Sequence, residues 1–157
     1  MSEEEINEEP VIQWVTFRLA DEKYGINVMQ VQEVLRITEI APVPGAPNEV
    51  VGIINLRGNV VTVINTRNRF GLEPIELDDS SRIIVIESGE KVIGILVDSV
   101  SEVVDLYDSD IELAPNVGNN ESSKYIQGVC SRDGQLLILV DLNRFLCDDE
   151  DDAMELF

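Results

Sequence analysis

Histidine is absent from this chain of 157 residues, and cysteine occurs only twice. Without histidine the sequence lacks the commonest metal ligand and the usual general base near neutral pH. The two cysteines, Cys130 and Cys147, form no C-x-x-C motif and stand in apolar strings, which is typical of buried, reduced thiols. Glycine-rich phosphate-binding motifs and the G-x-S-x-G nucleophile motif are missing as well. We therefore expect no enzymatic activity, no metal site and no cofactor.

Basic and aromatic residues are scarce. The chain has 11 lysines and arginines against 31 aspartates and glutamates, which gives a formal net charge of −20. Such a polyanion repels phosphate backbones and anionic lipid headgroups, so neither nucleic acid nor a membrane surface is an expected partner. The many carboxylates leave a paired-carboxylate hydrolase open as an enzyme class. One tryptophan and 5% aromatic residues nevertheless offer little to stack sugar rings or nucleobases.

Long apolar runs are missing too. No segment approaches the roughly 18 apolar residues of a membrane span, and the longest run, at 135–142, is interrupted by Asp141. The acidic N-terminus is unlike a secretory signal peptide. We therefore expect a cytoplasmic protein with no direct membrane insertion.

Negative charge is concentrated at the two ends of the chain. Residues 1–10 contain five acidic residues and no base, and residues 148–157 contain six acidic residues and no base. Runs of like charge favour solvated, flexible segments. We interpret residues 11–147 as the folded body and both ends as disordered acidic tails.

The folded body contains an internal repeat. Residues 25–34 and 94–103 are identical at six of ten positions, including the glycine that opens each segment. A second block, residues 52–64, matches residues 128–140 in order, with glycines at equivalent positions. Ordered matches of this kind indicate two copies of one small fold. We expect the copies to form two units in sequence order, residues 11–80 and 81–147.

Each copy has the pattern of a small all-β unit. Its apolar segments are short, turn residues separate them, and none shows a long helical period. A hairpin closes each copy, and Gly58 or Gly134 supplies the positive φ of its turn. Asn65 and Asp141 follow the hairpins as good N-caps for short helices. Five short strands in about 65 residues suit a closed barrel, so we predict two tandem barrels with a groove between them.

Four sequence blocks follow one another in a characteristic order. They are Y-G-I-N-V at 24–28, V-Q-E-V at 31–34, G-I-I-N-L-R-G at 52–58 and V-I-G-I-L-V-D at 92–98. With these blocks the chain resembles the CheW family, the adaptors of bacterial chemotaxis arrays, over nearly the whole folded body. The resemblance implies two SH3-like five-stranded β-barrels around a shared core, short helices and no catalytic activity.

The resemblance also implies a function. CheW-like adaptors couple the cytoplasmic tips of methyl-accepting chemotaxis receptors to the histidine kinase CheA, whose regulatory domain has the same double-barrel fold. A receptor helix lies in the groove between the barrels, and barrel ends of adaptor and kinase, or of further adaptor copies, alternate in rings. Recruitment to membrane-associated receptor arrays is part of this expectation. The alternative is a CheW-like module that binds a peptide or partner in a signalling pathway outside motility.

Arg57 is the strongest candidate for a binding residue. It is one of only 11 bases and lies in a turn between two apolar strands. Its equivalent in the second copy is Asp133, so the repeat itself does not require arginine there. The resemblance pairs this arginine with Glu33 of the V-Q-E block and places the pair at the receptor groove. Glu33 has an equivalent in Glu102, which leaves a structural role in both copies open.

Apolar positions beside this pair are further candidates for a groove that takes a helix. A role in the barrel core is as compatible with their residue types. The predicted receptor-binding set consists of Glu33 and Arg57 together with Val31, Gly52, Ile54, Leu56, Val97 and Val100. The resemblance places the kinase contact at barrel ends, in the loops near 40–48 and 114–120, and we assign it to Pro44, Ala46 and Val117.

Overall fold

The computed structural model describes residues 10–113 and 125–144. The predicted acidic tails lie outside the described residues, except for Pro10. In the described part, strands dominate, and helical residues are limited to η1 (Val28–Gln30), α2 (Thr66–Arg69), η2 (Asp108–Asp110) and positions 125 and 142–144. The strands are β1 (Val11–Leu19), β2 (Glu22–Asn27), β3 (Val31–Arg36), β4 (Val50–Leu56), β5 (Asn59–Asn65), β6 (Arg82–Ser88), β7 (Lys91–Val97), β8 (Ser99–Tyr107), β9 (Ile126–Arg132) and β10 (Gln135–Val140).

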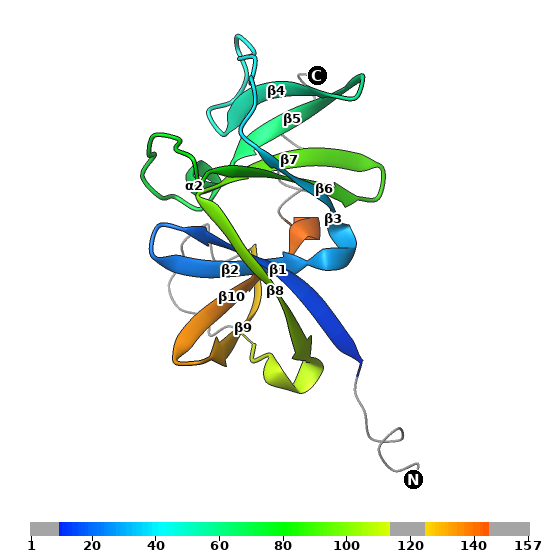
Figure 1. Cartoon of the computed structure of the whole chain (residues 1–157), viewed down its shortest axis with the longest axis vertical. Coiled ribbons are helices and arrows are strands. Elements are labelled where there is room, and N and C mark those ends of the chain that lie inside the picture. The colour runs from blue at the N-terminus through cyan, green and yellow to red at the C-terminus, as the bar shows by residue number, and fades with distance from the viewer. Residues whose placement is uncertain (1–9, 114–124, 145–157) are drawn as a thin grey trace.

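The strands form two five-stranded sheets, which lie one above the other along the long axis of the molecule (Figure 1). We call the sheet of order β8-β1-β2-β10-β9 sheet A and the sheet of order β3-β6-β7-β5-β4 sheet B. Each is antiparallel except for one parallel pair, β2 with β10 or β5 with β7. The all-β prediction with two five-stranded units is therefore confirmed.

Complete barrel closure is not seen among the described residues. The segment after β3 meets the edge strand β4 through one bridge between Ala41 and Ile53, and the segment after β8 meets β9 through one between Glu112 and Val129. Both bridges follow the end of the third strand of a repeat copy, so the two sheets curl in the same way.

The two sheets do not divide the strands at residue 80, because the two copies exchange strands. Sheet A takes β1 and β2 from the first copy and β8, β9 and β10 from the second. Sheet B takes β6 and β7 from the second copy and β3, β4 and β5 from the first. Equivalent strands occupy equivalent places in both sheets, so the repeat itself was recognised correctly.

The connections between strands account for this exchange. Only Asp98 separates β7 from β8, and the one-turn helix η1 separates β2 from β3. A tight hairpin needs two loop residues with the right backbone twist, so a single linking residue cannot turn β8 back onto β7. The chain therefore passes from one sheet to the other at both connections, and each copy completes its sheet with strands of the other.

The core has three parts. A large apolar cluster joins the sheets and includes buried Phe17 and Ile26 from sheet A and Ile84 and Ile95 from sheet B. Each sheet also encloses a cluster of its own, with Trp14 in sheet A and Val63 in sheet B among the fully buried residues. The shared cluster confirms the predicted apolar interface between the two units.

Asp98 forms a polar clamp where the chain crosses between the sheets. Its carboxylate accepts two hydrogen bonds from the Arg67 guanidinium of α2, at 2.9 and 2.7 Å, and a third at 2.8 Å from the backbone N–H of Ala20. Ala20 lies in the turn of sheet A between β1 and β2, whereas α2 follows β5 of sheet B. Burial works to raise the pKa of Asp98, but the Arg67 and Ala20 hydrogen bonds bring it below its ordinary value.

Asp98→Asn is expected to lower the free energy of unfolding at neutral pH by about 2 kcal/mol, because the partly buried Arg67 loses its charged partner. Since the folded-state pKa of Asp98 is lowered, its ionised form stabilises the fold above the unfolded pKa of about 4, and this contribution is lost at lower pH. Urea unfolding of both proteins should therefore show a difference that shrinks as the pH falls below about 4. Asp79→Asn in an exposed loop is the control, and an equal loss there would contradict a specific clamp.

Candidate protein-binding site

The β4–β5 hairpin holds Arg57 in a backbone conformation that arginine does not favour. Arg57 and Gly58 have φ values of +51° and +88°, as a two-residue type I′ turn requires. Such turns prefer asparagine, aspartate or glycine at the first position, and the equivalent turn has Asp133 there with φ of +51°. Turn geometry therefore does not explain the arginine, which points to a role for its side chain.

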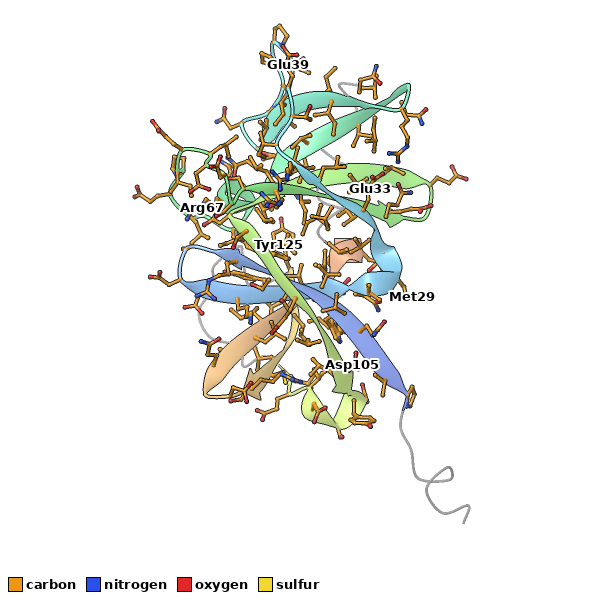
Figure 2. The ribbon with its side chains drawn as sticks, viewed as in Figure 1. Met29, Glu33, Glu39, Arg67, Asp105 and Tyr125 are labelled. Atoms are coloured by element: carbon orange, nitrogen blue, oxygen red, sulfur yellow. The ribbon has the colours of Figure 1, made fainter. Side chains whose placement is uncertain are left out.

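Arg57 forms an ion pair with Glu33 of β3, 24 residues earlier in the chain. One guanidinium N–H donates to Glu33 Oε1 at 3.4 Å, and the second terminal nitrogen donates to Oε2. The side chains are 68% and 28% exposed, respectively, and Figure 2 shows Glu33 at the surface of the upper sheet. The hydrogen bond from Arg57 lowers the pKa of Glu33. Because exposed ion pairs contribute little stability, this one adds little to the free energy of unfolding.

Three other predicted receptor-binding residues remain partly accessible. Leu56 directly precedes the Arg57 turn and is half-buried against the apolar cluster of sheet B. Val31 on β3 and Val100 on β8 are half-buried against the cluster that joins the sheets. β3 and β8 are each an edge strand of a sheet, so these positions stand where a partner has access to the backbone.

Three further predicted receptor-binding residues are buried in this structure. Ile54 is 3% exposed in the cluster of sheet B, and Val97 is 2% exposed in the shared cluster. Gly52 is buried beneath the segment around Ala41. All three therefore belong to the packed interior that underlies the surface around Arg57 and Glu33.

The predicted kinase-binding residues are only partly described. Pro44 is exposed and Ala46 half-buried in the loop between β3 and β4, where the Ala46 N–H donates to the Val43 carbonyl at 3.2 Å. Val117 lies outside the described residues. Pro44 and Ala46 thus belong to an accessible loop of sheet B. Earlier in this loop, Ala41 bridges to Ile53 of β4.

Sequence reasoning missed two exposed apolar side chains that are close in sequence to the residues of the ion pair. Val34 follows Glu33 on β3 and is 41% exposed, and Val60 stands three residues after Arg57 and is 67% exposed. Their repeat equivalents, Val103 and Leu136, are exposed as well. The sequence did contain a signal for Val34. Neighbouring residues on a strand face opposite sides, so Val34 faces away from the side on which Glu33 lies.

The described residues contain no cluster of three metal-ligating side chains. In the same part of the chain, no helix is long and apolar enough to cross a membrane. What the site offers is a charged pair, half-buried aliphatic side chains and edge strands. These are the elements of a surface that binds another protein.

Comparison with known proteins agrees with this class. The family model described as CheW-like domain matches residues 13–150. A chemotaxis protein CheW from Klebsiella aerogenes is 32% identical over 138 residues, which cover 88% of this chain and 83% of the relative. The Bacillus subtilis chemotaxis protein CheW is 32% identical over 132 residues, covering 84% of this chain and 85% of the relative.

A solved structure gives the same result. The crystal structure of the scaffolding protein TtCheW from Thermoanaerobacter tengcongensis superposes with a TM-score of 0.78 at 33% identity. The match covers 83% of this chain and 89% of that one. The chain is thus a non-enzymatic signalling scaffold with two interleaved β-sheets. It belongs to the CheW family of chemotaxis adaptor proteins.

Proposed function

We propose that this protein couples the cytoplasmic tips of methyl-accepting chemotaxis receptors to the histidine kinase CheA. The observation that carries the proposal is the Arg57–Glu33 ion pair, which is exposed and held by a turn that does not itself favour arginine. Its sequence context, N-L-R-G after V-Q-E, is the one by which the chain resembles chemotaxis adaptors. Such a role places the protein in the cytoplasm, at receptor arrays on the membrane.

The receptor contact is assigned to the surface around this pair. A receptor helix would lay its apolar anchors against Val31, Leu56 and Val100, which are half-buried and accessible. Glu33 and Arg57 would set the orientation of that helix through polar contacts. Gly52, Ile54 and Val97 support the same surface from beneath.

The contact with the regulatory domain of CheA is assigned to a different part of the molecule. Pro44 and Ala46 lie in the loop between β3 and β4, and Val117 is the third residue of this proposal. Separate surfaces for receptor and kinase allow both partners to bind at once. Weak contacts then gain strength from the many copies in an array, including any adaptor copies that meet one another in rings.

Reconstitution tests the coupling directly. The purified full chain is mixed with a CheA-type kinase and receptor-containing membranes, and kinase phosphorylation flux is measured. We expect the flux to rise at least tenfold with this protein and to fall when attractant is added. A second CheW-family adaptor serves as positive control for a competent kinase. Activation by that control but not by this chain would contradict the proposal and favour a partner in a pathway outside motility.

A further inference from the structure

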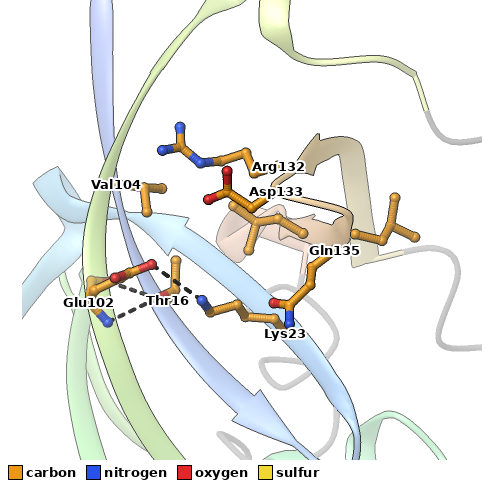
Figure 3. A pocket seen from close by; sticks show the side chains of 9 residues that line it. Thr16, Lys23, Glu102, Val104, Arg132, Asp133 and Gln135 are labelled. Carbon is orange, nitrogen blue, oxygen red and sulfur yellow. Dashed lines mark hydrogen bonds and ion pairs between the residues drawn. The ribbon is translucent and has the colours of Figure 1, made fainter.

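A hollow opens in the surface of sheet A beside the turn of the β9–β10 hairpin (Figure 3). Part of its lining is apolar, with buried Val104 and Leu137 next to Leu136, which is 48% exposed. Charged side chains line the rest, among them Lys23 and Asp133. A hollow with both apolar and charged lining can take the side chain of another protein as its occupant.

The equivalent place in sheet B has apolar side chains at three of the positions that line the hollow in sheet A. There the repeat has Val85, Val92 and Leu56, all members of the apolar cluster of that sheet. In sheet A the same three positions are Thr16, Lys23 and Arg132, and all three line the hollow. At these three positions the repeat thus has apolar side chains in sheet B and polar or charged side chains in sheet A.

Internal contacts hold one side of the hollow in place. Lys23 Nζ lies 3.3 Å from Glu102 Oε2. The Thr16 hydroxyl donates to the Glu102 carbonyl at 2.7 Å and accepts from the Glu102 N–H at 3.0 Å. Glu102 is the repeat equivalent of Glu33, but its cation comes from β2 and not from the hairpin turn.

The hairpin turn leaves an unpaired charge on the other side. Asp133 replaces the arginine of the equivalent turn and forms no ion pair within residues 10–113 and 125–144. The Arg132 guanidinium instead donates to the Asp105 carbonyl at 3.4 Å. The Asp133 carboxylate thus lines the hollow beside the exposed Leu136 and together with the Arg132 guanidinium, without an ion pair of its own among the described residues.

We propose that this hollow is a second protein-interaction site, which takes an aliphatic side chain from a partner segment that carries a lysine or arginine beside it. Val104, Leu136 and Leu137 would contact the aliphatic side chain, and Asp133 would accept from the cation. The net charge of −20 favours a basic segment and disfavours a second copy of this chain as occupant. The inference does not depend on the function assigned to the Arg57–Glu33 pair.

Peptide titration of the isotope-labelled full chain tests the site. The probe is a blocked pentapeptide, glycine-arginine-leucine-arginine-glycine, and the readout is the change in backbone amide NMR signals. We expect saturable shifts at Thr16, Lys23 and Leu137. Leu136→Glu should weaken this binding at least fivefold, and Asp133→Lys should weaken it about as much. Val60→Glu, at the equivalent exposed position of sheet B, is the matched control and should leave binding unchanged.

Two matched peptides separate the contributions of charge and apolar contact. Replacing the arginines by glutamates, or the leucine by serine, should abolish the shifts at the hollow. Shifts confined to the acidic ends of the chain, or equal binding by Leu136→Glu, would overturn the proposal. Concentration-dependent shifts of the same amides without peptide would also overturn it, by assigning the hollow to self-association.

Discussion

Arg57→Asn is expected to abolish receptor-dependent kinase activation, with a loss of more than tenfold, while the fold is kept. The substitution removes the guanidinium that pairs with Glu33 and presents charge at the exposed tip of the hairpin. It also creates an Asn-Gly turn, the preferred sequence for the positive φ values seen at this hairpin. We therefore expect a thermal midpoint equal to that of the unmodified chain or about 2 °C higher. Kinase flux and thermal unfolding of the same preparation provide the two measurements.

Matched variants separate the arginine's role from a general effect of charge. Arg36→Asn removes the same charge from an exposed position at the end of β3 and should retain full activation. Arg57→Lys keeps the charge but not the forked hydrogen-bonding geometry, so we expect an intermediate activity. Full activation by Arg57→Asn would remove Arg57 from the receptor surface, whatever its effect on stability.

Arg57→Asn is expected to keep or raise stability while function is lost, because arginine occupies a backbone conformation that favours another residue type. The two hairpins of this chain show the contrast within one molecule. Both turns have the same φ at the first central residue, but only one carries the residue type that this conformation favours. The sequence repeat made that contrast visible before the structure, because it aligned Arg57 with Asp133.

Local features of the fold were predictable because each depends on a few neighbouring residues. Positive φ occurs at Gly58 and Gly134, as the hairpin patterns indicated. The Asn65 side chain accepts from the N–H of Asn68, and Asp141 accepts from the N–H of Asn143, as expected of N-caps. These interactions span two to three residues, so the sequence alone contains the information that determines them.

Strand partners were not predictable in the same way. An arrangement in which each copy forms its own sheet and one in which the copies exchange strands have the same apolar pattern and the same turns. Only the short connection at Asp98 distinguishes the two arrangements, because one residue leaves no room for a hairpin between β7 and β8. The exchange makes each sheet depend on both halves of the chain, and the shared core reinforces that dependence.

Contact residues were similarly hard to separate from core residues. Ile54 and Leu56 are two positions apart on β4 and therefore face the same side of the strand. The first is fully enclosed, whereas the second reaches the end of the sheet and stays half-buried. Alternation shows which face of a strand is apolar, but it does not show where along the strand the covering layer ends.

Gly52→Ala is expected to be the most damaging single substitution in this region, with a loss of about 3 kcal/mol in the free energy of unfolding. A Cβ on residue 52 would lie 2.3 Å from the Ala41 carbonyl oxygen and 2.8 Å from Ile40 Cγ2. Ala41 and Ile53 exchange two backbone hydrogen bonds of 2.9 Å at this point, so the backbone cannot move away without losing them. The loss should appear in urea unfolding followed by far-UV circular dichroism.

Gly94→Ala is the matched control, because its Cβ would meet the Ile83 Cγ2 methyl group at 2.9 Å and not a backbone atom. A side chain can adjust, so we expect a smaller loss of about 1 kcal/mol. Fluorescence of Trp14, the single tryptophan, reports on sheet A while Gly52 lies in sheet B. Because the sheets exchange strands and share a core, the fluorescence midpoint should fall together with the dichroism midpoint in Gly52→Ala. A shift in dichroism alone would show that sheet B unfolds independently, and an unchanged midpoint in both would contradict the close approach at Ala41.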